Sequence, residues 1–182
     1  MKITPKKALP AVFLLATILI ASWFLSKPSG SADDRALIEA ARAGDAAATT
    51  RLLTAGANVN VKLVTPLWNQ LKDGEPAAEE GATPLHFAVE GGFQPVVGEL
   101  LAKGASIDAQ NQFGNTPLML AAGRLDSKLV SLLLEHGANA SITNKFGKSC
   151  VDFATKRNVR PEDRTLIKTL QDAIKQKPPI KS

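Results

Sequence analysis

Residues 81–89 read Gly-Ala-Thr-Pro-Leu-His-Phe-Ala-Val, and residues 114–122 read Gly-Asn-Thr-Pro-Leu-Met-Leu-Ala-Ala, so Thr-Pro-Leu returns 33 residues later. Gly104-Ala105 returns with the same step as Gly137-Ala138. A fixed period of this length is typical of stacked supersecondary units that bury a continuous core between neighbours. Such a stack usually presents a surface to a partner, so the period favours an interaction protein over an enzyme.

Each copy contains the signals for two helices. A threonine that can cap a helix stands before a proline at the first helical position, as Thr83 and Pro84 and again as Thr116 and Pro117. Apolar residues at helical spacing follow, and Gly104 can supply the left-handed residue after the second helix. We therefore expect an all-α chain built from helix-turn-helix units.

These residues carry a family resemblance. Residues 81–105 and 114–138 resemble two ankyrin repeats in their Thr-Pro-Leu start, their apolar second helix and their closing Gly-Ala. The resemblance implies an ankyrin-repeat solenoid with projecting loops, which binds a partner through its loop tips and concave face. His86 is the family's histidine and Met119 replaces it in the next copy, which implies a looser turn there.

Weaker copies on both sides bring the expected solenoid to about four units. The two full repeats span 81–113 and 114–146, an N-terminal capping unit spans 33–60, and a C-terminal capping unit spans 147–175. Polar, atypical end units are what a short solenoid needs to close its core.

The two capping units depart from the repeat pattern at identifiable positions. Arg35 stands where Thr-Pro should begin the first unit, whereas Ser149 is a suitable N-cap for the last unit and Cys150 replaces its proline. The final helix is expected from about Pro161, with Leu166, Ile167, Leu170 and Ile174 inward and Asp163, Arg164, Lys168 and Asp172 outward.

The period breaks once, because Gly56 and Gly104 are 48 residues apart, which leaves 15 extra residues. They fall within 61–80, where we expect an inserted loop with a short amphipathic helix capped by Thr65. Its apolar side either packs on the flanking helices as additional core or forms a partner-binding finger anchored by Trp68, since large aromatic side chains dominate interface energetics. The sequence leaves both interpretations open.

Residues 1–27 have the composition of a signal anchor or a signal peptide, followed by a linker at 28–32. Three lysines precede an uncharged stretch over 8–25, which as a helix would reach about 27 Å, close to a hydrocarbon core of about 30 Å. An uncleaved anchor is favoured because the possible cleavage sites are poor, but a cleaved signal stays open. The lysines predict the repeats in the periplasm, held at the inner membrane or released by cleavage.

The formal net charge of +5 is unevenly distributed, with +4 in residues 1–32, −5 in 33–144 and +6 in 145–182. The basic end, with its tail at 176–182, is either a solvated cap or meets an acidic partner or anionic lipid. Its basic side chains are not interleaved with aromatic ones, which argues against nucleic acid. Cys150 is the only cysteine, which excludes an intrachain disulfide and leaves a structural residue or, less favoured, a redox site.

No phosphate loop, metal-ligand spacing or nucleophile elbow is present, so we expect no catalytic residue, metal or cofactor. The resemblance places partner binding on loop tips and first helices, to which the insertion adds Trp68. Phe113 and Phe146 fit packing between neighbouring loops equally well. The candidate binding residues are Trp68, Glu79, Glu80, Glu90, Gln112, Phe113, Asn115, Arg124, Lys145, Phe146, Lys148, Lys156 and Arg157.

The expected function is a non-catalytic protein-protein interaction module, exported to the periplasm and tethered to the membrane, whose domain is monomeric and whose protein partner is unidentified. Exported bacterial ankyrin proteins that the chain resembles are associated with protection against oxidative stress or with neutralising a toxin. An accessory or toxin-neutralising protein of the envelope is therefore an alternative. Another is a structural protein that contacts anionic lipid through its basic end.

Overall fold

The computed structural model describes residues 32–64, 80–155, 160–161 and 163–176. By its internal contacts the chain divides after Ser31, and every described element belongs to the second unit. The hydrophobic helix expected within 1–27 lies outside the described residues, as do the linker up to residue 31 and the tail from residue 177. Within the described part, no helix is both long enough and apolar enough to cross a membrane.

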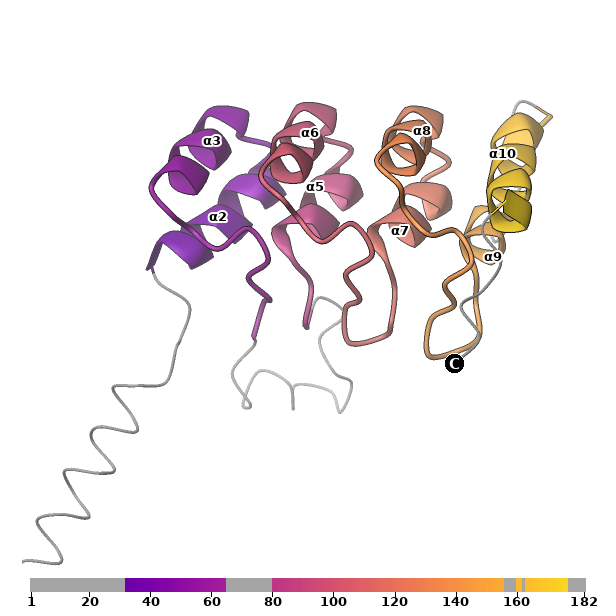
Figure 1. Ribbon diagram of the computed structural model, residues 1–182, viewed down its shortest axis with the longest axis horizontal. Helices are drawn as coiled ribbons and strands as arrows, with labels where there is room; N and C mark the ends of the chain where they lie inside the picture. The colour runs from indigo at the N-terminus through magenta and orange to yellow at the C-terminus, as the bar shows by residue number, and fades with distance from the viewer. Residues whose placement is uncertain (1–31, 65–79, 156–159, 162, 177–182) are drawn as a thin grey trace, which may run out of the picture. The chain divides into compact units, whose positions relative to one another are not determined.

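The described residues form helices and connecting loops, without strands, and the helices stack in pairs (Figure 1). A first row holds α2 (Ala32–Ala43), α5 (Pro84–Gly91), α7 (Pro117–Gly123) and α9 (Cys150–Thr155). A second row holds α3 (Ala46–Thr54), α6 (Gln94–Ala102), α8 (Ser127–Glu135) and α10 (Asp163–Gln176). The first loop joins α3 to α5, the second joins α6 to α7, and the third joins α8 to α9. These loops project beyond the first row.

The core runs continuously between the two rows. Along the first row α2 packs against α5, α5 against α7 and α7 against α9, so each pair is supported by its neighbours. Five leucines from α5, α6, α7, α8 and α10 are at most 1% exposed, namely Leu85, Leu100, Leu118, Leu133 and Leu170. Each such burial stabilises the fold by about 1.5–3 kcal/mol relative to an exposed side chain. The expected all-helical solenoid is confirmed for this part of the chain.

The helices begin where the Thr-Pro signals predict. Thr83 is the N-cap of α5 and forms a capping box with His86, and Thr116 Oγ1 accepts a hydrogen bond from the Met119 N–H (3.4 Å). In the last helix pair, the side chains of Ser149 and Asp152 each accept a hydrogen bond from the backbone N–H of the other residue. The Ser149 N–H donates to Asp152 Oδ2 (2.7 Å) and the Asp152 N–H donates to Ser149 Oγ (3.3 Å). A capping box therefore replaces the missing proline at the start of α9.

The expected outward orientation of Asp163 is wrong. This side chain is 6% exposed because its carboxylate accepts hydrogen bonds from the Arg160 backbone N–H (3.0 Å) and the Arg160 Nε–H (3.4 Å). Leu166 and Leu170 are buried as predicted. The carboxylate thus closes the turn before α10 instead of facing solvent.

The inserted loop has a closed base. The Leu63 N–H donates to the Ala82 carbonyl (2.8 Å), and the Gly81 N–H donates back to the Leu63 carbonyl (2.9 Å). Leu63 also packs against a small cluster that includes Ile38 and Phe87, so its side chain is additional core. Residues 65–79, with Thr65 and Trp68, lie outside the described residues, and the binding finger stays a prediction.

Candidate functional site

The tips of the second and third loops are formed by the same turn. In the second loop Asn111 Oδ1 accepts hydrogen bonds from the backbone N–H groups of Phe113 and Asn115, both at 3.0 Å. In the third loop Asn144 Oδ1 makes the equivalent two bonds at 2.9 Å. An asparagine side chain that bonds to its own backbone holds a turn in one conformation. Both tips are therefore fixed locally by their first residue.

Neighbouring tips are also bonded to each other through the backbone. The Lys145 N–H of the third loop donates to the Phe113 carbonyl of the second loop at 3.0 Å. The Gln112 N–H of the second loop donates in the same way to the Glu80 carbonyl of the first loop at 2.9 Å. The first bond thus joins the second and third tips, and the second bond joins the second tip to the described end of the first loop.

A glycine allows this close approach. Gly114 has a φ of +77°, and a Cβ built on it would lie 2.9 Å from the backbone nitrogen of Lys145. Gly147 occupies the same place in the third tip, with a φ of +70°, but a Cβ there would meet nothing within 4 Å. The third tip is thus the last of the described row and leaves one side open.

Two aromatic rings stand side by side on these tips. The ring centroids of Phe113 and Phe146 are 6.1 Å apart with an interplanar angle of 35°. Such a pair contributes about 0.5–1.5 kcal/mol beyond its area burial. Phe146 nevertheless remains 68% exposed. The rings therefore pack against each other between neighbouring loops, while Phe146 still faces solvent, and partner binding through them stays a prediction.

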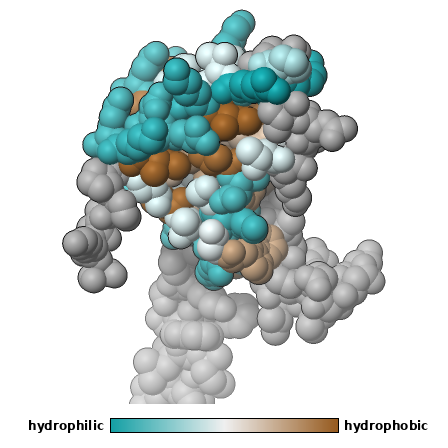
Figure 2. Space-filling model, turned by 90° about the vertical axis from the view of Figure 1, so that its right-hand side faces the viewer, coloured by the Kyte–Doolittle hydropathy of each residue, from teal (hydrophilic) through white to brown (hydrophobic). Residues whose placement is uncertain are grey.

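The rings border a groove of about 660 Å³ between the loop tips and α9. Its lining residues come from the second loop, the third loop and α9, so the groove lies where these two loops meet the first row of helices. Viewed from the α9–α10 end, apolar and hydrophilic residues meet on the lower part of the described surface (Figure 2). The groove is lined by Phe113, Asn115, Asn144, Phe146, Lys148, Asp152, Phe153 and Thr155.

The charged groups in and beside the groove differ in their interactions within the protein. The Asp152 carboxylate accepts hydrogen bonds from the Ser149 hydroxyl and backbone N–H, both at 2.7 Å, and these bonds hold the pKa of Asp152 below its usual value. Lys145 and Lys148 are exposed, and the ion pairs seen in the described part involve neither of them. Both ammonium groups are therefore at the surface, and the charge of Lys148 adds to the lowering of the Asp152 pKa.

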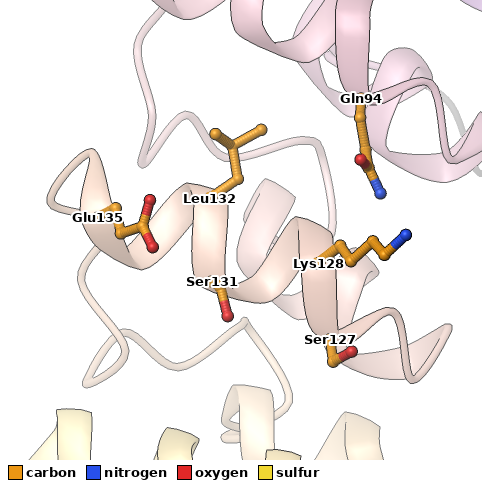
Figure 3. Close-up of a pocket in the computed structure, with 6 residues that line it drawn as sticks. All are labelled: Gln94, Ser127, Lys128, Ser131, Leu132 and Glu135. Carbon is orange, nitrogen blue, oxygen red and sulfur yellow. The ribbon is translucent and has the colours of Figure 1, made fainter.

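A second hollow, of about 390 Å³, lies between α6 and α8 (Figure 3). Gln94 comes from α6, and the other lining residues, Ser127, Lys128, Ser131, Leu132 and Glu135, all come from α8. It contains no aromatic side chain, and its one cation and one anion stand a full seven residues apart on the same helix. This composition is less suited to anchoring a partner than that of the groove.

The structure brings four of the candidate binding residues into the groove, namely Phe113, Asn115, Phe146 and Lys148. Gln112, Lys145 and Glu80 belong to the row of tips through their backbone bonds. The remaining candidates in the described part are elsewhere. The Arg124 guanidinium donates to the Glu90 carbonyl, so it connects the ends of α7 and α5. Trp68, Glu79, Lys156 and Arg157 lie outside the described residues.

Sequence reasoning missed four groove residues: Asn144, Asp152, Phe153 and Thr155. One signal for Asn144 was available, because it follows Asn111 by the same 33 residues as the phenylalanines. Asp152, Phe153 and Thr155 come from α9, whose contact with the third tip depends on how neighbouring pairs stack.

His86 is a bracing residue and is not accessible for catalysis. The Thr83 N–H donates to Nδ1 (3.2 Å), so Nε2 carries the proton and donates to the Asn115 carbonyl (3.0 Å) of the second loop. The side chain is 1% exposed, and burial lowers its pKa to about 4. The neutral ring therefore links α5 by a hydrogen bond to the second loop, which contributes residues to the groove.

Cys150 has the properties of a structural residue. Its side chain is buried, Sγ lies 3.4 Å from the Ala140 carbonyl, and burial raises the pKa of the thiol to about 11. The thiolate that redox chemistry requires is therefore disfavoured. Among the described residues, no group of three or more His, Cys, Asp or Glu side chains could hold a metal ion.

The family profile described as Ankyrin repeats (3 copies) matches residues 37–145 and, in an overlapping match, residues 85–174. The chain belongs to the ankyrin repeat family. Rabankyrin-5 of Homo sapiens is 43% identical over 49 residues, which is 27% of this chain and 4% of that protein. RelA-associated inhibitor of Mus musculus is 34% identical over 78 residues, or 43% of this chain and 10% of that protein. The ankyrin chain thus spans at most a tenth of these relatives, and its family generally mediates protein-protein interaction without catalysis.

Proposed function

We propose that this ankyrin repeat protein is a non-catalytic module that binds a partner protein in the groove between the second and third loop tips and α9. The observation that carries the proposal is the 68% exposure of Phe146 beside that groove. An exposed aromatic side chain next to a hollow, with polar groups around it, is typical of an interaction site.

The construction of the tips supports the same function. The asparagine side chains fix each tip, and the backbone bonds between Lys145 and Phe113 and between Gln112 and Glu80 fix neighbouring tips to each other. A surface that is ordered before binding loses less conformational entropy when the partner arrives. The groove is therefore preorganised for association.

We further propose that the repeats act in the periplasm, with residues 1–27 as membrane anchor or cleaved signal. The support is the lysine-flanked uncharged stretch over 8–25. A reporter that is active only in the periplasm is fused after Ser182, and we expect this fusion to show reporter activity. Activity from a cytoplasmic reporter alone would contradict this location.

Site-specific photocrosslinking in cells tests the binding function. A benzoylphenylalanine replaces Phe146, which keeps an aromatic side chain at the tip, and in a control it replaces Ser131 in the second hollow. We expect one protein to be crosslinked from position 146 and not from position 131. Equal labelling from both positions, or no protein adduct from position 146, would refute the proposal.

A further inference from the structure

We infer that the groove receives an acidic segment of the partner that places one large apolar side chain against the aromatic rings. This inference rests on the proposed function and specifies the chemistry of the partner. It is drawn from the hydrogen-bond donors, the charges and the apolar surface of the groove, which come from different elements of the fold.

The orientation of two asparagines leaves a donor at the groove. The Asn144 Oδ1 atom is fixed by two backbone N–H donors, so its Nδ2 group is free to donate and reaches Asn115 Oδ1 at 2.8 Å. This bond in turn fixes Asn115, whose Nδ2 group makes no hydrogen bond in the described part of the chain. The groove therefore offers an amide donor and calls for an acceptor on the ligand.

The charge at the groove also favours an acceptor-rich ligand. Lys148 lines the groove and Lys145 is exposed on the same loop tip. The carboxylate that lines the groove, that of Asp152, accepts two hydrogen bonds from Ser149 and also interacts with the Lys148 charge. Carboxylates on the partner complement this pattern and accelerate its approach.

The apolar part of the groove has room for an anchor. Phe113 and Phe146 form its border on the tips, and Phe153 reaches it from α9. The volume of about 660 Å³ lies within the roughly 300–1,000 Å³ that pockets use to enclose small ligands. One large side chain with its flanking backbone fits such a space, whereas a folded surface does not enter it.

The test is a selection of random nine-residue peptides displayed on phage, using the full-length protein as bait and soluble F146A protein as competitor. Affinities of the selected peptides are then measured for wild type, for the double variant K145E/K148E and for the control K103E/K128E. The control changes the net charge equally at two exposed lysines, Lys103 directly after α6 and Lys128 in α8. Glu→Gln and Asp→Asn versions of each peptide complete the comparison.

We expect enriched peptides with net negative charge and one large apolar residue. K145E/K148E should weaken their binding at least about tenfold and K103E/K128E less than about twofold, and added salt should weaken wild-type binding. Neutral or basic consensus peptides, equal effects of both double variants, or no peptide that depends on Phe146 would each overturn the inference. If position 146 still crosslinks a cellular partner, the proposed function survives that failure. If position 146 crosslinks nothing, the proposed function fails as well.

Discussion

At the residue scale, the two full repeats cap the N-terminus of their first helix with different side chains. The His86 ring accepts a hydrogen bond from the Thr83 N–H and donates one to the Asn115 carbonyl of the next loop. Met119 has no nitrogen for either bond, so Thr116 caps its helix alone. The looser turn that the Met119 substitution implies thus corresponds to one missing bond between units. The hydrogen bond from His86 to the Asn115 carbonyl thus links the cap of α5 to a residue that lines the groove.

Acidification should destabilise the protein through His86. The pKa of His86 is about 4 in the folded state, whereas an unperturbed histidine, as in the unfolded chain, has a pKa of 6.5. As the pH falls, the unfolded state is therefore protonated before the folded state. The contribution of the neutral ring is therefore complete above pH 6.5 and declines as the pH falls from 6.5 towards 4. Linkage gives a loss of about 1.4 kcal/mol per pH unit in that window. Urea unfolding at pH 7.5 and 5.5 should differ by roughly 1 kcal/mol.

The chain supplies its own control, because its second histidine, His136, is exposed on the end of α8. H136Q should retain the loss of stability on acidification. H86Q should be less stable at pH 7.5 but should lose little more at pH 5.5. An unchanged pH dependence in H86Q would show that another group is responsible.

The sequence predicts residues of this kind well when their role is local. Thr83 and Pro84 lie next to the helix that they begin, so the order of residue types is sufficient. Asp163 was placed wrongly because its burial depends on a turn with Arg160 that the helical spacing alone does not contain. Leu125 is a similar case, with a φ of +59° at a position where the previous unit has Gly92.

At the element scale, the turn between α5 and α6 is packed around one ring. A Cβ built on Gly91 would lie 2.1 Å from Cε2 of Phe93, and a Cβ on Gly44 would lie 2.5 Å from Cδ1 of the same ring. Gly44 follows α2, so this ring connects the first two helix pairs. Gly98, in the middle of α6, has nothing within 4 Å of a Cβ.

Two alanine substitutions in this pair of helices should have opposite signs. G91A should destabilise by about 1–3 kcal/mol because the Phe93 ring must move. G98A should stabilise by about 0.5–1 kcal/mol because alanine favours the helix and meets open space. Chemical denaturation of both variants gives the comparison. A stabilising G91A would mean that Phe93 repacks without cost.

A second matched pair tests the row of loop tips. G147A should cost about 1–2 kcal/mol, which is the penalty for a left-handed alanine alone. G114A should cost at least about 1 kcal/mol more, because its Cβ also presses on the Lys145 backbone. Free energies of unfolding for both variants provide the test, and equal losses would show that the tips do not support each other.

The groove illustrates what element-level reasoning from sequence can and cannot give. The 33-residue spacing of Phe113 and Phe146 places both on equivalent loop tips, which the structure confirms. The contribution of Phe153 depends on the register between the third tip and α9, a tertiary quantity that no local pattern specifies.

At the scale of the whole molecule, the main helix contacts of the described unit join neighbours within a pair or in adjacent pairs. The last pair closes the line, since α10 packs on both α8 and α9 and fully buries Leu170. In such arrays stability is approximately a sum of repeat and nearest-neighbour terms. Damage to one end should therefore stay near that end.

L170A should cost about 2–5 kcal/mol, the usual range for a leucine truncated in a packed core. Hydrogen exchange should show faster opening of α9 and α10, with much smaller changes in α5 and α6. Uniformly faster exchange in all helices would instead indicate that the unit unfolds as a single block.

The closed base of the insertion has a consequence for how this protein can change. The backbone at Leu63 is hydrogen-bonded to Gly81 and Ala82 across the base of the insertion. We therefore expect residues added or removed within 65–79 to leave the spacing of the second and third tips unchanged. The second and third tips take their register from each other, through the bond from Lys145 to Phe113. A foreign peptide or a reporter tag inserted within residues 65–79 is therefore expected to leave the bond between the second and third tips in place.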